Sequence, residues 1–355
     1  MDKLQTLIKN RKIRFGLVGC GRIAQNNFSA IEQHKKNAEL VSICDVDKNA
    51  LDDAEKKTGA TPFNSLNSML KESDVDVVIL TTPSGFHSAQ TIQVAEAGKS
   101  VITEKPMATK WKDAKSMVKA CDDNGVRLFV VKQNRYNRTL QFLKTALEKN
   151  RFGKIYMVNL NVFWTRPQSY YDQGDWRGTL DLDGGAFMNQ ASHYVDLINY
   201  LIGPLESLQA YTATLGRDIE AEDTGVISMK WRNGALGTMN VTMLTYPKNF
   251  EGSITVLGEK GSVRIGGVAV NEIQHWEFED VEKDDEKIEE ANYKTTSVYG
   301  YGHPLYYENI IDVMRGKAAP KTDGREGLKS LEVIIAAYLS SREGKRIFFP
   351  LDSQA

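Results

Sequence analysis

Two proton-handling side chains occur in opposite halves of the sequence. Lys105 follows the short apolar run Ser100–Thr103, and a lysine at the end of a buried strand is costly unless it has a partner or a task. His193 follows Asn189 by four residues in a segment that we expect to be helical, so the two side chains share a face. An imidazole, with an ordinary pKa of about 6.5, commonly takes the proton of an alcohol near neutral pH. These residue types predict proton transfer at a hydroxyl group.

Each of these side chains also has a structural interpretation that the sequence leaves open. The lysine can extend along apolar surface and place its ammonium group in solvent. A single histidine on a helix is most often a satisfied core residue. The catalytic interpretation of His193 is favoured by its polar neighbours and by Gly184 and Gly185, which permit the helix to begin close against another surface.

A glycine-rich turn near the N-terminus has the spacing of a dinucleotide site. Gly19, Gly21 and Ala24 follow the apolar run Ile13–Val18 and precede a helical pattern. In such a turn the first glycine bends the chain, the second lets a pyrophosphate approach the backbone, and the third small residue packs helix on strand. Asp45 ends the next apolar run, where a carboxylate bonds ribose hydroxyls and repels a 2'-phosphate, which favours NAD over NADP. Asp45 could instead cap a helix, although a second aspartate two residues later already fills that position.

The elements that must position these groups alternate between strand and helix through the first half of the chain. Continuous apolar strands separated by helices predict a doubly wound parallel sheet, with ligands at the carboxyl ends of the strands. The expected strands are Ile13–Val18, Leu40–Cys44, Val75–Thr81, Ser100–Thr103 and Arg127–Val131. The expected helices follow Ala24 and span Lys48–Thr58, His87–Ala97 and Lys110–Asn124.

The second half changes to alternating apolar and polar residues, which predicts a large, mainly antiparallel open sheet. We expect an α/β protein in which residues 1–134 form an NAD-binding Rossmann domain and residues 135–355 form an α+β domain for substrate binding and oligomerisation. The acidic stretch Glu279–Glu290 is expected to be a solvated loop or edge. Strands are expected at Ile155–Trp164, Leu208–Thr214, Thr224–Trp231, Ala235–Met243, Gly252–Leu257, Ser262–Ile265 and Ile273–Phe278. Helices are expected at Thr139–Lys149, Asp183–Ile198, His303–Arg315 and Arg325–Arg342.

Length and composition narrow the functional classes. The 355 residues correspond to two domains of about 150 residues each. The 45 lysine and arginine residues against 46 aspartate and glutamate residues argue against a nucleic-acid surface or a polybasic membrane patch. Three scattered cysteines favour a reducing, cytoplasmic setting, and five dispersed histidines give no metal-ligand spacing. Met1–Arg14 lacks the apolar core of a signal peptide, and no apolar run reaches about 18 residues.

Three motifs together resemble the Gfo/Idh/MocA family of sugar dehydrogenases, over essentially the whole chain. They are the turn Gly19–Ala24, the triplet Glu104–Pro106, and Gly184 and Gly185 followed by Asn189 and His193. In that family the lysine of the triplet and the helix histidine flank the substrate carbon over the nicotinamide, and the histidine typically serves as the base. The resemblance implies these roles for Lys105 and His193, with Asn189 in place of an aspartate that many members carry. It also implies contacts to NAD from Gly19, Gly21, Arg22, Ile23, Ala24, Asp45, Thr82, Ser84, His87, Glu104, Lys105 and Gln133.

A narrower resemblance is carried by Val131–Arg135, Phe163–Pro167, Tyr170–Gln173 with Trp176–Thr179, Met188–His193, and Leu244–Asn249. These segments resemble the members of this family that oxidise the C3 hydroxyl of UDP-2-acetamido-2-deoxy-D-glucuronic acid for surface-polysaccharide (O-antigen) synthesis. Arginine forks suit the diphosphate and the carboxylate of that UDP-sugar acid, and aromatic rings suit uracil or sugar stacking. Arginine-rich and aromatic loops also occur at oligomer interfaces, and the resemblance suggests a homotetramer built on the sheet faces. The expected substrate contacts are Lys105, Arg135, Trp164, Arg166, Tyr170, Tyr171, Trp176, Arg177, Asn189, His193, Tyr246 and Lys248.

Two other functions stay open at the level of the sequence. One is an NAD-dependent dehydrogenase that acts on another sugar or an inositol with the same catalytic groups. The other is a non-catalytic sensor that binds NAD(H) and a partner protein. The presence of both Lys105 and His193 argues against the sensor, because a sensor has no need for two proton-handling groups.

Overall fold

The computed structural model describes residues 7–295, 300 and 302–351, which form two compact units. The first unit contains the residues up to Lys132 together with His303–Leu328. The second contains Gln133–Gly302 and the residues from Lys329 onward. The chain therefore returns to the first unit near its end, a return that the expected division at residue 134 does not include.

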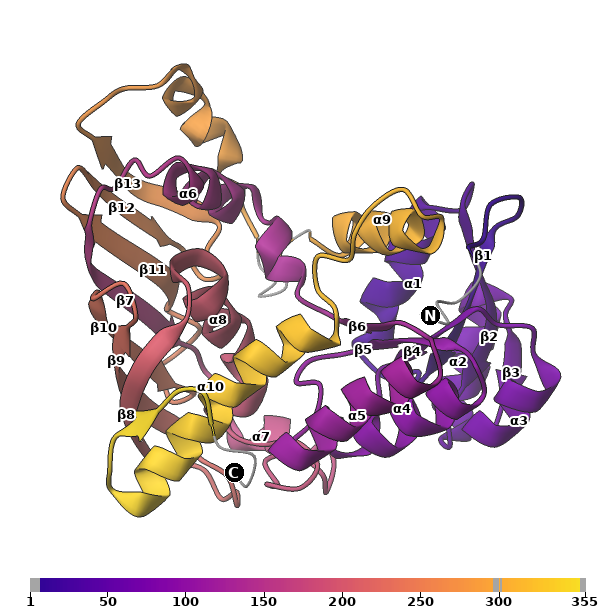
Figure 1. Ribbon diagram of the computed structural model, residues 1–355. Coiled ribbons are helices and arrows are strands. Elements are labelled where there is room, and N and C mark those ends of the chain that lie inside the picture. The colour runs from indigo at the N-terminus through magenta and orange to yellow at the C-terminus, as the bar shows by residue number, and fades with distance from the viewer. Residues whose placement is uncertain (1–6, 296–299, 301, 352–355) are drawn as a thin grey trace. The chain divides into compact units, whose positions relative to one another are not determined.

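A six-stranded parallel sheet forms the core of the first unit (Figure 1). Its strand order is β3-β2-β1-β4-β5-β6, and every neighbouring pair is parallel. The order reverses between β1 and β4, and ligands of such sheets bind beyond the carboxyl ends of the strands at this reversal. The predicted doubly wound sheet is confirmed. The strands are β1 (Ile13–Val18), β2 (Ala38–Cys44), β3 (Thr61–Phe63), β4 (Val77–Leu80), β5 (Ser100–Thr103) and β6 (Leu128–Val130).

Helices connect these strands, and one further helix joins them from near the end of the chain. The side chain of Asp47 accepts a hydrogen bond from Asn49 N (2.9 Å) and so caps the second helix, as predicted. The late helix α9 packs against α1, where the Tyr307 hydroxyl donates to Asn27 Oδ1 (2.6 Å). The helices are α1 (Ala24–Gln33), α2 (Lys48–Thr58), α3 (Leu66–Glu72), α4 (His87–Glu96), α5 (Trp111–Asp123) and α9 (His303–Met314), with a short 3-10 turn η1 (Ser84–Phe86) before α4.

The second unit is built on an eight-stranded sheet of order β13-β12-β11-β7-β10-β9-β8-β14. Neighbouring strands are antiparallel except β7 and β10, which are parallel, so the predicted mainly antiparallel sheet is confirmed. The strands are β7 (Ile155–Phe163), β8 (Leu205–Ala213), β9 (Thr224–Trp231), β10 (Leu236–Thr242), β11 (Glu251–Gly258), β12 (Gly261–Gly266), β13 (Glu272–Phe278) and β14 (Ile347–Phe348).

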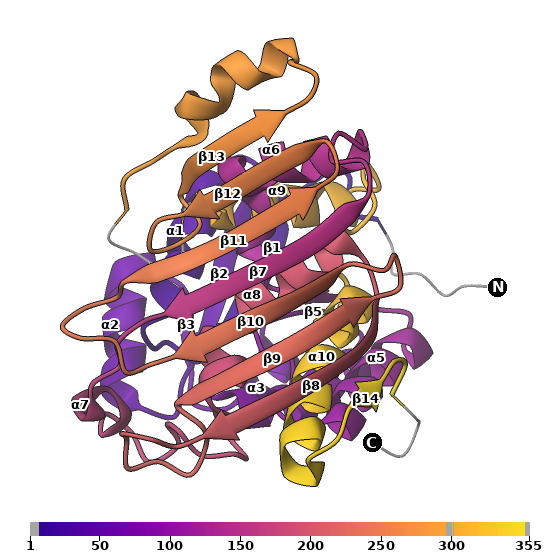
Figure 2. The ribbon, with the colours of Figure 1, turned by 90° about the vertical axis from the view of Figure 1, so that its left-hand side faces the viewer.

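Within the part of the chain that the structure describes, helices cover one face of this sheet and leave the other uncovered. Figure 1 shows α6, α8 and most of α10 on the covered face, and Figure 2 shows the strands from the uncovered side. On the uncovered face the paired residues Met157, Leu236 and Leu257 lie side by side, as do Tyr211 and Val226. These five apolar side chains are all exposed. The helices are α6 (Arg138–Glu148), α7 (Gln168–Tyr171), α8 (Ser192–Leu197) and α10 (Gly324–Glu343), with a 3-10 turn η2 (Gln133–Tyr136) before α6.

The segment that carries Asn189 and His193 differs from the single regular helix expected over residues 183–198. It consists of a π-helical turn η3 (Ala186–Gln190), the short α8, and a second π-helical turn η4 (Ile198–Ile202). The bond from Ala191 N to Ala186 O (2.8 Å) shows the wider spacing of the first π turn. The two polar residues therefore do not occupy successive turns of one α-helix.

The acidic stretch after β13 is mostly exposed to solvent, as expected, but much of it is a helix and not a loop. Residues Lys283–Ala291 form a 3-10 helix, η5, whose start is closed by reciprocal bonds between Glu282 and Asp285. Both carboxylate oxygens of Asp285 accept bonds from the Arg151 guanidinium at 2.7 Å. This ion pair lowers the pKa of Asp285 to about 2. The stretch is thus fastened to the unit by paired charges, which charge composition alone does not reveal.

No helix among the described residues has the length and the apolar run needed to cross a bilayer. Residues 1–6 of the N-terminal segment, for which the sequence predicts no signal peptide, lie outside the described residues.

Candidate active site

The glycine turn of the first unit has the geometry that a dinucleotide requires. Gly19 has φ +98°, and a Cβ there would lie 2.8 Å from the Thr81 carbonyl carbon, so only glycine fits. A Cβ at Gly21 would meet nothing within 4 Å, which leaves the backbone open to a close ligand. The amides at the start of α1 have no side-chain cap. These features fit a pyrophosphate at the turn.

The Asp45 carboxylate is held at the glycine turn and does not cap a helix. One of its oxygens accepts from Cys20 N (2.6 Å) and the other from Asp47 N (2.9 Å). The capping position of α2 belongs to Asp47, so the alternative interpretation of Asp45 is wrong. A half-buried carboxylate fixed beside the turn is suited to ribose hydroxyls and unsuited to a 2'-phosphate. The donor set therefore fits NAD.

The loops that follow β4 and β5 are tied together by a buried histidine. His87 Nδ1 lies 3.0 Å from the Pro106 carbonyl oxygen, and Nε2 lies 2.9 Å from that of Thr82. Burial lowers the pKa of His87 to about 4. The Thr82 hydroxyl donates to Gln90 (2.6 Å), and Ser84 is buried in the same turn. Because both ring nitrogens face backbone carbonyls, any effect of His87 on a cofactor runs through the position of these loops.

A buried carboxylate lies directly behind Lys105. Glu104 is 5 % exposed and accepts from Lys105 N (3.3 Å) and from Asn27 Nδ2 (3.4 Å). Burial raises the pKa of Glu104, and the charge of Lys105 opposes that rise. Asn27 in turn accepts from Tyr307 of α9. A chain of three side chains thus connects the lysine backbone to two helices of the same unit.

In the second unit, Asn189 and His193 face different partners. The Asn189 amide donates to Asp183, whose other carboxylate oxygen accepts from Gly178 N (2.8 Å). His193 is 5 % exposed, and its Nε2 lies 3.0 Å from the amide nitrogen of Gln133. The imidazole orientation is therefore set by the η2 turn, and the Asn189 orientation by the loop that precedes η3.

A buried ion pair fastens η2 to α8. Arg135 donates to both oxygens of Asp196, at 2.7 and 2.8 Å, and its guanidinium also lies over the Tyr200 ring. The two side chains are only 7 % and 3 % exposed. The arginine fork that the sequence suggested for an anionic substrate is thus engaged with Asp196. The ion pair fixes the η2 turn, which also carries Gln133 beside His193.

The aromatic and arginine residues of the loop after β7 form a stacked ladder. Arg166 lies between the rings of Trp164 and Tyr170, at 5.4 and 5.5 Å from their centroids. Arg177 lies between Tyr170 and Trp176, at 4.6 and 4.4 Å. The Trp164 ring is buried, and its Nε1 donates to the Val268 carbonyl. The ladder keeps two guanidinium planes fixed by rings, as anion recognition requires.

Three further residues proposed for substrate binding lie in contrasting settings. Tyr171 is buried, and burial raises the pKa of its hydroxyl. Tyr246 is 94 % exposed, and Lys248 is also exposed, both in the loop after β10. Asn249 of the same loop accepts from Thr165 N (2.9 Å), which holds this loop against the start of the ladder. The loops after β7 and β10 are thus held together, but Tyr171 is buried while Tyr246 and Lys248 are exposed.

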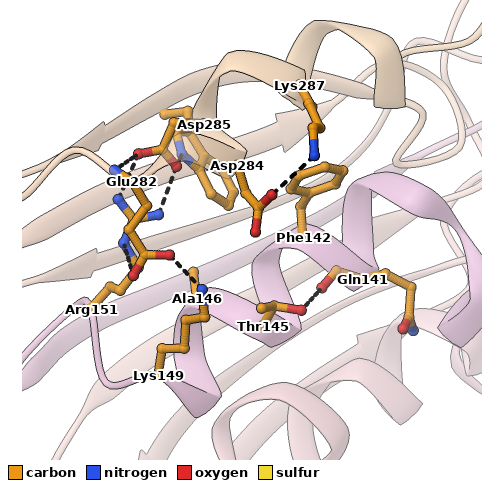
Figure 3. A pocket seen from close by; sticks show the side chains of 11 residues that line it. Gln141, Phe142, Thr145, Ala146, Lys149, Arg151, Glu282, Asp284, Asp285 and Lys287 are labelled. Atoms are coloured by element: carbon orange, nitrogen blue, oxygen red, sulfur yellow. Dashed lines mark hydrogen bonds and ion pairs between the residues drawn. The ribbon is translucent and has the colours of Figure 1, made fainter.

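One cavity of the second unit lies away from these residues. It has a volume of about 290 Å³ and is bounded by α6, β13 and η5 (Figure 3). Its charged side chains are paired with each other: Arg151 with Asp285, Lys149 with Glu282 and Lys287 with Asp284. None of the site residues expected from the sequence lines it. Nowhere in the described part of the chain do three histidine, cysteine or acidic side chains gather as they would around a metal ion.

Two family profiles match almost the whole described chain. Residues 13–132 match the oxidoreductase family, NAD-binding Rossmann fold, and residues 144–349 match its C-terminal alpha/beta domain. The chain belongs to the Gfo/Idh/MocA oxidoreductase family. The resemblance stated from the sequence motifs is confirmed.

Solved and curated relatives within the Gfo/Idh/MocA family differ widely in similarity. The WlbA dehydrogenase from Chromobacterium violaceum, solved in complex with NADH and UDP-GlcNAcA, is 65% identical over 98% of each chain, with a TM-score of 0.94. The WlbA dehydrogenase from Bordetella pertussis, with the same two ligands, is 64% identical over 97% of this chain and 100% of that chain, with a TM-score of 0.95. Myo-inositol 2-dehydrogenase from Thermotoga maritima is 26% identical over 71% of this chain and 74% of its own length.

Some residues of this Gfo/Idh/MocA site could not be selected from the sequence. Asn27 and Tyr307 are 280 positions apart, and only the packing of α9 on α1 brings them together. Asp183 was included in the expected helix but not assigned as a partner of Asn189. Glu222, a buried carboxylate beside η3, carried one signal: two consecutive acidic residues directly before a strand whose alternate residues are apolar.

Proposed function

We propose that this protein oxidises the C3 hydroxyl of UDP-2-acetamido-2-deoxy-D-glucuronic acid to the 3-keto sugar, with NAD as the acceptor. The observation that supports this function most strongly is the identity of 65% and 64%, along nearly the full chain, with dehydrogenases solved with NADH and UDP-GlcNAcA. The myo-inositol 2-dehydrogenase at 26% identity supports the oxidoreductase class without indicating the substrate.

The residues of the first unit provide for the cofactor. Gly19 and Gly21 let the diphosphate approach the start of α1, and Asp45 accepts the ribose hydroxyls. The loop after β4 carries Thr82 and Ser84, and it borders the same end of the sheet as the loop after the neighbouring parallel strand β5. When bound, NAD supplies the nicotinamide carbon that accepts the hydride from C3 of the sugar.

Lys105 and His193 handle the charge and the proton of the substrate hydroxyl. We assign to Lys105 a hydrogen bond to the 3-hydroxyl oxygen, because an ammonium group stabilises the negative charge that grows there as the hydride leaves. His193 accepts the hydroxyl proton on its imidazole. Glu104 holds the Lys105 backbone, and Gln133 orients the imidazole through Nε2. The protein thus fixes two groups that are otherwise mobile.

The nucleotide-sugar part of the substrate requires cations and flat surfaces. The ladder of Arg166 and Arg177 with their aromatic neighbours offers both, because the rings fix guanidinium planes that can face a phosphate or carboxylate. Tyr246 and Lys248 lie exposed in the neighbouring loop and complete the proposed contacts. Asn189, whose amide donates to Asp183, is proposed to contact the sugar.

A direct assay separates this function from its alternatives. The protein is mixed with NAD and either UDP-GlcNAcA, UDP-GlcNAc, free N-acetylglucosaminuronic acid or myo-inositol, and NADH absorbance is followed. Strong reduction with UDP-GlcNAcA alone supports the proposed substrate. Reduction with myo-inositol instead supports another polyol, and tight NAD binding without any reduction supports the sensor. The Lys105→Met variant serves as the inactive control.

The cellular setting follows from the same substrate. We place the reaction in the cytoplasm, where UDP-sugars and NAD are available, and in the synthesis of a surface polysaccharide such as an O-antigen. Inactivating the gene should remove that polysaccharide, and the wild-type gene but not Lys105→Met should restore it. A normal polysaccharide without the gene would refute this role.

The uncovered sheet face is proposed as the interface of a homotetramer. Its apolar side chains, Met157, Leu236 and Leu257 in one group and Tyr211 and Val226 in another, suit contact with a second copy. Light scattering of the purified protein should give four times the chain mass of 39.8 kDa. Leu236→Asp should lower that mass, and an unchanged mass would exclude this face.

A further inference from the structure

A buried carboxylate is hydrogen-bonded to the backbone of η3, the turn that carries Asn189. Glu222 lies just before β9 and is 6 % exposed. Its Oε1 accepts from Phe187 N (2.9 Å), and its backbone oxygen accepts from Ala186 N (2.9 Å). The Tyr338 hydroxyl of α10 donates to the same Oε1 (3.0 Å). Glu222 and Tyr338 together form a clamp on the first residues of η3.

The clamp explains the glycine at position 185. A Cβ at Gly185 would lie 1.8 Å from Glu222 Oε2, so any other residue would displace the carboxylate. The sequence suggested that the two glycines let the helix begin close against another surface, and Glu222 is that surface. Backbone bonds carry the constraint forward, because Asn189 N donates to the Gly185 oxygen (2.9 Å).

Burial and hydrogen bonding act in opposite directions on the ionisation of Glu222. Burial raises its pKa to about 7, although its bonds from Phe187 N and Tyr338 act in the opposite direction. The titratable group facing it from α10 is Tyr338, whose own pKa is raised well above its ordinary value. On its own segment, Asp223 disfavours the charge of Glu222. On the segment that leads into η3, the carboxylate of Asp183 is engaged with Asn189.

We propose that Glu222 is a positioning residue for Asn189 and His193 in the dehydrogenase reaction, an inference that rests on the proposed function. Glu222 touches neither side chain and acts by fixing η3, from which α8 continues. The ionised carboxylate holds the turn more tightly than the neutral acid, because a hydrogen bond to a charged acceptor is the stronger one. Turnover therefore depends on the charge of Glu222 as well as on the space that its side chain fills.

Two variants separate charge from shape. Glu222→Ala removes the clamp, and kcat should fall about 10- to 100-fold with little change in KM for NAD, since a misplacement near 1 Å has a cost of that order. Glu222→Gln keeps an oxygen for Phe187 and Tyr338 but has no charge at any pH. At pH 8 its kcat should be about threefold below that of the wild type. Near pH 6 the two enzymes should differ little, because the wild-type carboxyl is then protonated.

The ratio of wild-type to variant kcat, followed from pH 6 to pH 8, is the decisive measurement, because ionisable groups that Glu222 does not affect contribute equally to both enzymes and cancel. Asp285→Asn is the matched control, because it removes a carboxylate from the same unit at the Arg151 pair. Its ratio should be constant between pH 6 and pH 8. A constant ratio for Glu222→Gln, or an unchanged kcat for Glu222→Ala, would overturn the inference.

A readout that needs no substrate distinguishes this inference from the proposed function. In Glu222→Ala the Phe187 amide loses its acceptor, so its hydrogen exchange should accelerate by about tenfold or more, and the NMR titration of His193 should shift. Asp285→Asn should change neither. If none of the sugars tested allows the wild-type protein to reduce NAD, the proposed function fails. The hydrogen-exchange and His193 titration measurements still decide the role of Glu222 in that case. Unchanged exchange and titration in Glu222→Ala would refute it.

Discussion

The Glu222→Gln substitution should stabilise the protein above neutral pH while it slows turnover. The folded carboxyl has a pKa of about 7, against an ordinary value of 4.5. Between these values the folded state holds a proton that the unfolded state releases, so stability falls as the pH rises through this range. The gap of about 2.5 units, at about 1.4 kcal/mol per unit, amounts to a loss of about 3 kcal/mol above pH 7. Glutamine has no charge to bury and escapes this loss.

The assay is urea unfolding of wild type and variant at pH 5 and pH 8. We compare the free energy of unfolding of Glu222→Gln with that of the wild type at each pH. This difference should favour the variant by up to about 3 kcal/mol more at pH 8 than at pH 5. Asp285→Asn again serves as the control. Its carboxyl has a pKa lowered to about 2 by Arg151, so its stabilisation is present above the ordinary 3.8 and is lost only as the pH falls through about 2. Its effect should be equal at pH 5 and pH 8. A pH-independent difference for Glu222→Gln would show that the carboxyl titrates alike in both states.

Four other substitutions test the remaining roles. Lys105→Met should lower kcat about 100- to 1,000-fold while calorimetry shows unchanged NAD affinity, and near-normal turnover would remove the lysine from the mechanism. His193→Asn should lower kcat about 100- to 10,000-fold and flatten its pH dependence; an unchanged profile would reassign the base. Asp45→Ala should reduce the ratio of kcat/KM for NAD over NADP, and an equal ratio would limit Asp45 to holding the turn. Asp196→Ala leaves the Arg135 charge buried and should lower the free energy of unfolding by about 3–5 kcal/mol, so a loss below about 1 kcal/mol in urea unfolding would contradict the ion pair's importance.

The elements of the first unit could be predicted because their signals are local. Buried parallel strands such as β1 and β5 are continuous apolar runs, and Asp47 marks the start of α2 at the predicted residue. The short strand β3 has only three residues, two of them exposed, so it has no apolar run to detect. The helix α3, with seven residues, is equally short. Length, more than chemistry, explains these omissions.

The parts of the candidate site that the sequence does not predict depend on contacts between distant segments. The π turn η3 was predicted as ordinary helix, because apolar spacing cannot distinguish a turn that is one residue wider. The carboxylate that bonds its backbone is that of Glu222, more than 30 positions later, and this carboxylate accepts from Tyr338, another 116 positions beyond that. A local pattern contains neither. The sequence could locate Lys105 and His193 by their types, but not the side chains that hold them.

Each unit places a buried carboxylate behind a segment that carries a proposed catalytic group. Glu104 accepts from Lys105 N in the first unit, and Glu222 accepts from Phe187 N in the second. Burial raises the pKa of both carboxyls, so both are less stable as charges than they would be in water. An apolar residue at either position would avoid that cost but would leave a buried amide without its acceptor. The two carboxylates therefore exchange some stability for fixed backbone beside the reacting groups. Their removal should slow turnover, whereas the loss of Asp196 from the Arg135 pair is expected to act mainly by lowering folding stability.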